Sequence, residues 1–361
     1  MLRGTADLPL HYGSSPRWLF ERMTKLARAI TEILVDEYNK KEFLKRLSEP
    51  YWFQCFACVL GFDWHSSGTT TVTMAALKEA LQKSELAQEI FVCGGKGKTS
   101  RKTPEEIKEI GEKINLSDKK ISELIKASKL AAKVDNAALQ DGFQLYHHSF
   151  VFTDEGDWTI VQQGMNDATG YARRYHWLSK PELNFVDEPH AAIASDIIVK
   201  PLNMVAHEAE ETRKCSVDLA KENPIHLKLQ LEKQTTLTSF SMPTTHFPKI
   251  KKLKINYKAL QKAYQMQPEN YEELLLIEGI GQSTIRALAL ISNLIYGSQL
   301  SWRDPCKYAF AHGGKDGWPY PVNKKQYDKS IAMLEEAIQQ AKLERKEKLN
   351  ALKRLSEYIK F

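Results

Sequence analysis

The chain has 361 residues, of which 42% are hydrophobic, so it is long enough for two or three domains with buried cores. Lys and Arg outnumber Asp and Glu by 51 to 45, and this mild excess of positive charge favours a polyanionic partner. An apolar run of about 18 residues is missing, which argues against a membrane-spanning helix. The N-terminal residues also lack an apolar signal core, so the protein is expected to be cytoplasmic.

Helical patterns dominate the first 135 residues. Ser15 and Pro16 hold the N-cap and first-turn positions ahead of an apolar stripe that starts at Leu19. Thr103, which two acidic residues follow closely, and Ser117 are predicted to cap two later helices. These patterns predict an N-terminal helical domain over residues 1–140.

A polar turn, GFDWHSSGTTT, separates two of these helices. Asp63 and His65 stand two residues apart in it, and together they suit a metal site or an acid–base site. The same residues would equally form a polar cap for the following helix. The sequence leaves both interpretations open.

Residues Val92 to Thr103, VCGGKGKTSRKT, combine glycines with cations. The segment lacks the first glycine of a phosphate-binding P-loop, because Val92 stands at that position. A flexible basic loop that binds a phosphate backbone is one interpretation, and a solvated loop is the other. The candidate nucleic-acid contacts here are Lys96, Lys98, Arg101 and Lys102.

The character of the sequence changes at residue 143, where two β-rich runs flank the turn-forming residues 154–157. This pattern predicts a β-hairpin, and helix is predicted to return near residues 189–221. The densest group of polar residues in the chain surrounds the hairpin. The candidate catalytic residues in this group are His147, His148, Gln163, Arg173, Arg174 and His176.

This group suits a site that acts on phosphodiester bonds. Arginine binds phosphate through two N–H groups, and histidine serves as a nucleophile or as a general acid. Strand alternation places His147 and His148 on opposite faces, so only one of them is expected to face a pocket, and the sequence does not decide which. The alternative is that these side chains satisfy buried hydrogen bonds.

A helix–turn–helix pattern follows a predicted linker at residues 233–248. In LLLIEGIGQSTIRALALI, two glycines separate two helical runs, and six lysines lie between residues 249 and 262 just before it. Glycines permit a sharp turn and a close approach to a surface, and the second helix would direct its first N–H groups at an anion. An ordinary packing turn is the alternative. The residues predicted to contact a DNA phosphate are Gly279, Gly281, Gln282, Ser283 and Thr284.

Two further features belong to the C-terminal part of the chain. Lys315 lies in a glycine-rich stretch, FAHGGKDGWPYP, and is another candidate for nucleic-acid contact. Residues 324–361 have the pattern of a basic amphipathic helix, through which we expect the protein to bind other DNA repair proteins.

The stretch EGIGQSTIRALALI resembles the helix-hairpin-helix motif of DNA repair proteins, including the base-excision glycosylases. In those glycosylases a catalytic aspartate follows the hairpin, and Asp304 stands near that place. Ser283 occupies the position at which bifunctional glycosylases carry lysine. The resemblance implies DNA binding and makes Asp304 a candidate catalytic residue.

A second resemblance covers nearly the whole chain. The motifs GTADLPLHYGSSPRWLFERM, FDWHSSGTTT, GGKGKTSRKTPEE, YHHSF, VQQGMN, ARRYHWLS and FAHGGKDGWPYPV occur in the order typical of the family called domain of unknown function 763. This family is found mainly in archaea and thermophilic bacteria. The resemblance implies no particular activity.

The predicted fold is mainly α with a small central β-hairpin or sheet (α+β) and a C-terminal helix-hairpin-helix module. The predicted domains are residues 1–140, 141–232 and 249–323, followed by the helix at 324–361. The leading functional hypothesis is a DNA-binding genome-maintenance protein that acts as a repair nuclease. The alternatives are a base-excision glycosylase that uses Asp304 and a non-catalytic DNA-binding scaffold. No membrane contact is expected, and the sequence leaves the need for a divalent metal open.

Overall fold

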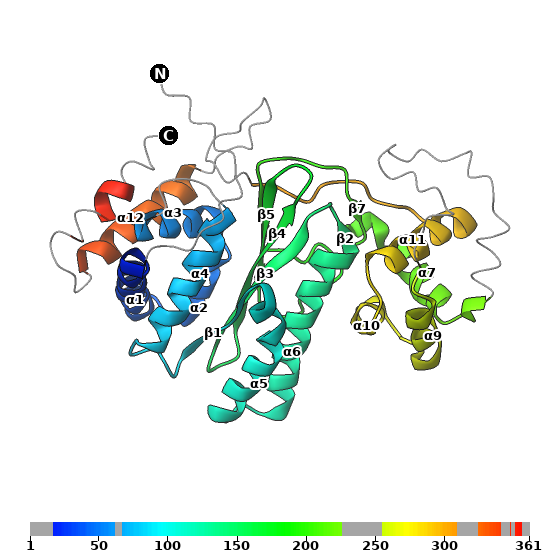
Figure 1. Cartoon of the computed structure of the whole chain (residues 1–361), viewed down its shortest axis with the longest axis horizontal. Helices are drawn as coiled ribbons and strands as arrows, with labels where there is room; N and C mark the ends of the chain where they lie inside the picture. The colour runs from blue at the N-terminus through cyan, green and yellow to red at the C-terminus, as the bar shows by residue number, and fades with distance from the viewer. Residues whose placement is uncertain are drawn as a thin grey trace, which may run out of the picture.

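A five-stranded antiparallel sheet stands between two groups of helices in the computed structural model of the chain (Figure 1). The structure describes residues 17–61, 67–225, 255–308, 324–340, 347 and 351–355. Its longer helices are α1 (Arg17–Glu37), α2 (Lys40–Leu47), α3 (Pro50–Leu60), α4 (Ser67–Gln82), α5 (Thr103–Lys113), α6 (Asp118–Lys133), α7 (Glu210–Ala220), α9 (Tyr257–Met266), α10 (Tyr271–Leu276), α11 (Gln282–Tyr296) and α12 (Lys324–Gln340).

The sheet has the strand order β1-β3-β4-β5-β6, and each strand is antiparallel to its neighbours. Its middle is the predicted hairpin, in which residues 154–157 join β3 to β4. The mainly helical α+β class is therefore confirmed. The strands of the sheet are β1 (Ile90–Lys96), β3 (Gln144–Thr153), β4 (Trp158–Asn166), β5 (Tyr171–Leu178) and β6 (Ala192–Ser195), while β2 (Leu139–Gln140) and β7 (Leu202–Asn203) pair separately.

Alternating side chains give the sheet two faces with different coverings. One face, here called the N-terminal face, includes Val151 and Val161 and packs against α1–α4 and α12. The other, the C-terminal face, includes Phe150 and Ile160 and packs against α5, α6, α7, α9, α10 and α11. Figure 1 shows these two groups of helices on the two sides of the sheet. The sheet thus separates two apolar cores.

Polar side chains form hydrogen bonds with the backbone at the starts of several helices. The Ser117 hydroxyl accepts the backbone N–H of Lys120 at the start of α6, as predicted. Thr103 is instead the first residue of α5, and its hydroxyl donates to the backbone oxygen of Ser100. Such bonds occupy backbone groups that lack a partner within the helix.

Two segments differ from their predicted structure. Val92 to Thr103, predicted as a flexible loop, contains the end of β1 and the 3₁₀ turn η1 (Gly97–Lys102). Residues 189–221, predicted as helix, contain strand β6, and α7 begins only at Glu210. In both segments the reason is tertiary pairing, because β1 pairs with β3 and β6 pairs with β5.

Packing continues across the predicted domain boundaries. Strand β1, from residues 1–140, belongs to the same sheet as the later strands, and α12 packs against α1 and α3. Leu334 and Ile338 of α12 are fully buried there, so the apolar stripe of this helix serves the core of the chain itself. The predicted linker at 233–248 lies outside the described residues. Of the helices that are described, none is long and apolar enough for a membrane span.

Candidate functional site

Four polar side chains form a row across the N-terminal face of the sheet. In the strand register, Lys96 of β1 lies opposite His147 of β3, His147 opposite Gln163 of β4, and Gln163 opposite Arg174 of β5. Neighbouring strands lie about 4.8 Å apart, so this polar row spans roughly 14 Å. It runs from an exposed lysine at the edge of the sheet to a buried arginine beneath α3 and α4.

His147 is the residue of the row with unused hydrogen-bonding capacity. Its side chain is buried, and its Nε2 lies 2.9 Å from the hydroxyl of Ser149. Its Nδ1 has no hydrogen-bond partner in the described part of the chain. Burial, assisted by His148 and Lys96, lowers the pKa of His147 to about 3. The imidazole is therefore neutral near pH 7, with one ring nitrogen unoccupied.

His148 lies on the opposite face, as strand alternation predicts, and both of its ring nitrogens are occupied. The Gln162 amide donates to Asp135 over 2.5 Å, which turns the amide oxygen toward Nδ1 of His148 at 2.8 Å. His148 Nδ1 is thus the donor, and Nε2 accepts from the Ser128 hydroxyl at 2.9 Å. Burial lowers the pKa of His148 below its ordinary value. Its bonding satisfies a buried network and leaves no capacity for a ligand.

Arg174 and His176 form the deep end of the polar row. Nε of Arg174 donates to His176 Nε2 over 2.9 Å, and His176 Nδ1 donates to the Leu47 carbonyl oxygen over 2.9 Å. Burial and the neighbouring guanidinium hold the pKa of His176 well below its usual range. The guanidinium of Arg174 also lies 4.4 Å from the ring centroid of Phe53 and donates to Gln54. His176 therefore acts as a neutral acceptor that orients Arg174.

Arg173 belongs to a different site on the C-terminal face. It donates to Asp141 over 3.1 Å and to both carboxylate oxygens of Asp304 over 3.0 and 2.7 Å. Although burial opposes its charged form, these two carboxylates raise the pKa of Arg173 above its ordinary value. Asp304 also accepts the backbone N–H groups of Val199 and Cys306. Both oxygens of the predicted glycosylase carboxylate are thus engaged inside the protein.

Sequence reasoning missed two buried acids, Asp141, which binds Arg173, and Asp135. Asp135 lies in a π-helical turn, Val134–Ala138, and accepts hydrogen bonds from Gln162, Trp177 and His190. A signal was present, since Asp135 stands in an otherwise largely apolar segment. π-Helical turns often occur at functional sites, but this carboxylate is fully buried and already has three donors.

The predicted basic residues continue from the edge of the polar row. Here we call Lys96, Lys98, Arg101 and Lys102 the basic segment; all four side chains are exposed, at the end of β1 and in η1. No ion pair joins any of them to another described residue. Lys96 lies 6.0 Å from the ring centroid of Tyr146, next to His147. The structure thus brings two predicted groups, the basic segment and His147, into contact.

The predicted DNA-binding turn lies on the other side of the sheet. Gly279 has a φ of +87°, and the turn is attached to the region around α6 by Lys133, which donates to the Ile280 oxygen over 2.6 Å. The side chain of Gln282 donates to the Asn136 oxygen, and Thr284 is buried. Of the predicted contact residues, Gly279 and Ser283 are exposed. Helices α10 and α11 belong to the C-terminal core, on the opposite side of the sheet from α1–α4 (Figure 1).

Asp63, His65 and Lys315 lie outside the described residues. Two described residues that are near these segments along the chain, Thr70 and Tyr308, lie close to the polar row. Thr70, near the start of α4, accepts from Arg174 over 3.4 Å, and the backbone of Tyr308 bridges to Ala194, which pairs with Arg174. Within the described ranges, no three His, Cys, Asp or Glu side chains are grouped to hold a metal ion.

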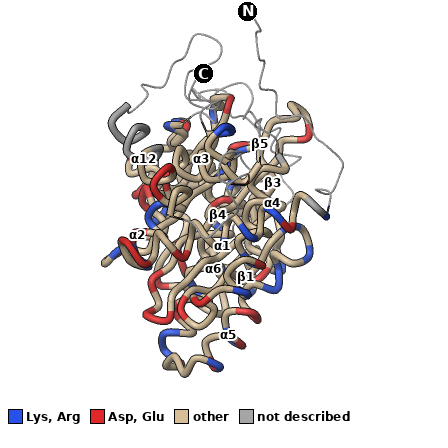
Figure 2. Tube along the Cα trace, turned by 90° about the vertical axis from the view of Figure 1, so that its left-hand side faces the viewer, with Lys and Arg blue, Asp and Glu red and all other residues tan. Residues whose placement is uncertain are grey.

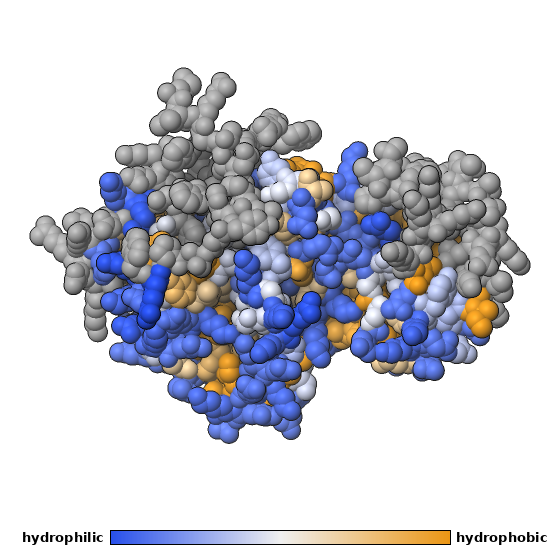
Figure 3. Space-filling model, viewed as in Figure 1, coloured by the Kyte–Doolittle hydropathy of each residue, from blue (hydrophilic) through white to orange (hydrophobic). Residues whose placement is uncertain are grey.

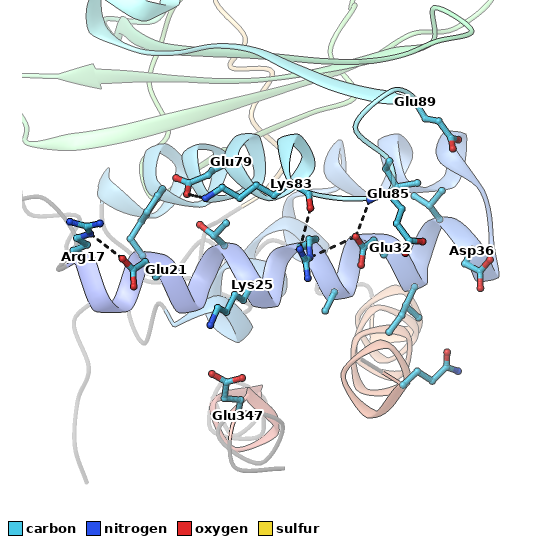
Figure 4. A pocket seen from close by; sticks show the side chains of 18 residues that line it. Arg17, Glu21, Lys25, Glu32, Asp36, Glu79, Lys83, Glu85, Glu89 and Glu347 are labelled. Atoms are coloured by element: carbon cyan, nitrogen blue, oxygen red, sulfur yellow. Dashed lines mark hydrogen bonds and ion pairs between the residues drawn. The ribbon is translucent and has the colours of Figure 1, made fainter. Parts of the chain in front are cut away.

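A long groove follows the outer face of α1 (Figure 4). Carboxylates outnumber cations among its lining residues, but many of them are paired, as Arg17 is with Glu21 and Lys83 with Glu79. Figure 2 shows this mixture of charges over the N-terminal helices. Figure 3 shows mainly hydrophilic residues on the face viewed there, with small separate hydrophobic areas. His147, Gln163 and Arg174 do not line the groove, which is therefore separate from the polar row.

Comparison with known families gives one match. The family model described as "Protein of unknown function (DUF763)" matches residues 4–322. The matched range includes the polar row, the basic segment and the α10–α11 turn. No curated protein and no solved structure matches the chain.

Proposed function

The chain belongs to the DUF763 family of proteins of unknown function, and we propose that it is a DNA-binding genome-maintenance enzyme that hydrolyses phosphodiester bonds at the polar row. The observation that carries this proposal is the unoccupied Nδ1 of His147, buried between a cationic segment and a buried arginine. A ligand at this position would give Nδ1 the partner that it lacks among the described residues.

The chemistry assigned to His147 is proton acceptance. When Nε2–H donates to Ser149, Nδ1 carries the lone pair and can take a proton from an attacking water. The hydroxide then attacks phosphorus, the bond to the leaving oxygen breaks, and solvent protonates that oxygen. A phosphate anion beside the imidazole favours the protonated ring, so substrate raises the pKa of His147 toward the working range. Lys96 stabilises the charge on the phosphoryl oxygens. Arg174 contributes only through its positive charge, because its N–H groups already donate to His176, Gln54, Thr70 and Pro50.

The products formed from end-labelled DNA test this function and separate it from the alternatives. We expect strand breaks, measured on single-stranded, nicked, mismatched and damaged substrates. Abasic sites without breaks would support the glycosylase alternative. Binding without either product would support the non-catalytic scaffold. The structure gives the glycosylase alternative no support, because Asp304 already accepts four hydrogen bonds inside the protein.

We expect DNA affinity to fall steeply with salt, because each phosphate neutralised by a lysine or arginine releases a condensed counterion. Each contact contributes about −0.7 to −0.9 to the slope of log affinity against log salt. Replacing Lys98 and Lys102 by Ala should weaken binding and make this slope shallower by about 1 to 2. Fluorescence anisotropy over a salt series measures both quantities.

The matched control replaces two other exposed lysines, Lys108 and Lys113 of α5, by Ala. These lie beyond the basic segment along the chain, and the slope should stay close to that of the unsubstituted protein. An equal change of slope in the two double variants would mean that the basic segment has no special role.

Gly281→Val should lower DNA affinity by about tenfold while the protein stays folded, because a hydrogen bond to a charged phosphate is lost. The fold itself tolerates a side chain here: a Cβ at Gly281 would have no atom within 4 Å, and its φ is −144°. Gly279 differs, since its φ is +87° and a Cβ would lie 3.0 Å from that of Ala259. The fold therefore explains why residue 279 is a glycine. It does not explain Gly281, and we propose that a glycine there lets a phosphate approach the backbone.

Anisotropy and thermal unfolding of Gly281→Val, with Gly279→Val as the comparison, test this assignment. Gly279→Val should lose stability, because valine rarely adopts a positive φ. Unchanged DNA affinity in a folded Gly281→Val protein would identify the turn between α10 and α11 as a packing turn.

A further inference from the structure

A β-bulge places Tyr146 beside His147 on the same face of the sheet. The register of β3 against β4 shifts between Leu145 and His147, so Tyr146 is the extra residue of the bulge. Strand alternation alone would place two consecutive residues on opposite faces. Instead, Tyr146 packs against Met165, Ala172 and Ala194, and its hydroxyl accepts from the amide of Gln163. Bulges redirect side chains in this way and are common next to active sites.

The bulge creates an alternation of aromatic and cationic groups at the Lys96 end of the polar row. Tyr146 is half-buried, with the ammonium of Lys96 6.0 Å from its ring centroid, and the rest of the basic segment follows Lys96 along the chain. On the other side, Tyr308 packs against the same small cluster as Tyr146 and makes an edge contact with Tyr51. Aromatic platforms combined with a cationic track are typical of surfaces that bind single strands.

The position of His147 restricts the substrate further. Its side chain is only 1% exposed, and Gln163 and Arg174 on the same row are equally buried. A base that is paired within a duplex has no free face to stack on Tyr146, and the width of a duplex keeps its backbone away from a buried imidazole. An unpaired strand can place a base on the ring and its phosphates on the exposed basic segment next to His147.

We propose that the polar row takes single-stranded nucleic acid, with one base stacked on Tyr146 and the adjacent phosphates on the basic segment and His147. This inference rests on the proposed function and defines its substrate class. Since the sheet separates the row from the α10–α11 turn, a substrate that contacts both must pass around an edge of the sheet, which a flexible single strand can do.

The experiment compares a labelled oligothymidylate of about 16 nucleotides with a hairpin duplex of the same total length, using the full chain at one salt concentration. We expect binding of the single strand to be about tenfold tighter or more. Tyr146→Leu should weaken single-strand binding by about 5- to 100-fold, the range for one lost base stack, whereas Tyr146→Phe should retain most of the affinity. Tyr296→Leu, which removes an exposed ring on α11, is the matched control and should bind normally.

A second measurement uses the unsubstituted protein, so it does not depend on how a variant folds. An oligothymidylate that carries 5-iodouracil is cross-linked by light, and the attached peptide is identified by mass spectrometry. We expect the cross-link at Tyr146.

The outcomes distinguish this inference from the proposed function. Equal affinity for the two DNA forms, normal binding by folded Tyr146→Leu, or cross-links confined to other segments would each overturn the single-strand assignment and leave phosphodiester hydrolysis standing. Failure to bind either DNA form would overturn the proposed function, and the single-strand assignment with it.

Discussion

His147→Ala is expected to reduce DNA cleavage by about two to four orders of magnitude, the usual contribution of a general acid or base. The variant removes the ring nitrogen that has no partner in the described residues and leaves the basic segment intact. DNA binding should therefore change little. Single-turnover cleavage and anisotropy, measured on the same purified protein, separate the two effects.

His148→Ala is the matched control, because it removes an adjacent imidazole of the same size from the other face of the sheet. Its loss leaves the Ser128 hydroxyl and the Gln162 amide oxygen buried without their partner, at about 1–3 kcal/mol for each group. This variant should lose stability toward urea, while its folded fraction still cleaves DNA. Full cleavage by His147→Ala would place the chemistry elsewhere, and Asp63 with His65 would become the leading candidates.

Asp304→Ala is expected to lower the free energy of unfolding by about 3–5 kcal/mol, because it breaks a buried ion pair and leaves part of the charge of Arg173 uncompensated. The backbone N–H groups of Val199 and Cys306 lose their acceptor in the same change. Urea denaturation followed by circular dichroism measures the loss. Asp141 still contacts Arg173, so we expect a weakened fold rather than complete unfolding.

Glu278→Ala provides the control, since Glu278 is an exposed carboxylate whose partner, Lys262, is also partly exposed. Surface pairs of this kind contribute little, so its stability should stay close to that of the unsubstituted chain. Asp304→Asn tests the glycosylase alternative. A fully stable Asp304→Asn protein that had lost the ability to form abasic sites would contradict our structural assignment of Asp304.

Local sequence patterns were sufficient to predict several elements of the fold. The period-2 runs on either side of residues 154–157 predict the β3–β4 hairpin, and the cap at Ser117 predicts the start of α6. The same alternation places His147 and His148 on opposite faces. These features depend on neighbours a few residues away, which the sequence displays directly.

The composition of the candidate site could also be predicted, but its arrangement could not. The sequence identifies His147, Gln163 and Arg174 as an unusual concentration of polar residues. It does not show that Lys96 joins them, because β1 reaches β3 only across more than 40 intervening residues. The sequence likewise predicts a loop where β1 ends and a helix where β6 lies, because the conformation of these two strands comes from pairing with distant strands.

The amino-acid sequence by itself determined the helices and the hairpin, the alternation along the strands and the set of groups available for chemistry. Only the tertiary structure decided which of them are already used. It assigns Arg173 and Asp304 to each other, occupies both nitrogens of His148 and leaves Nδ1 of His147 open within the described residues. The physical reason is that a hydrogen bond or ion pair needs two groups within about 3 Å, and which distant groups meet at that distance depends on the packing of the sheet between its two layers of helices.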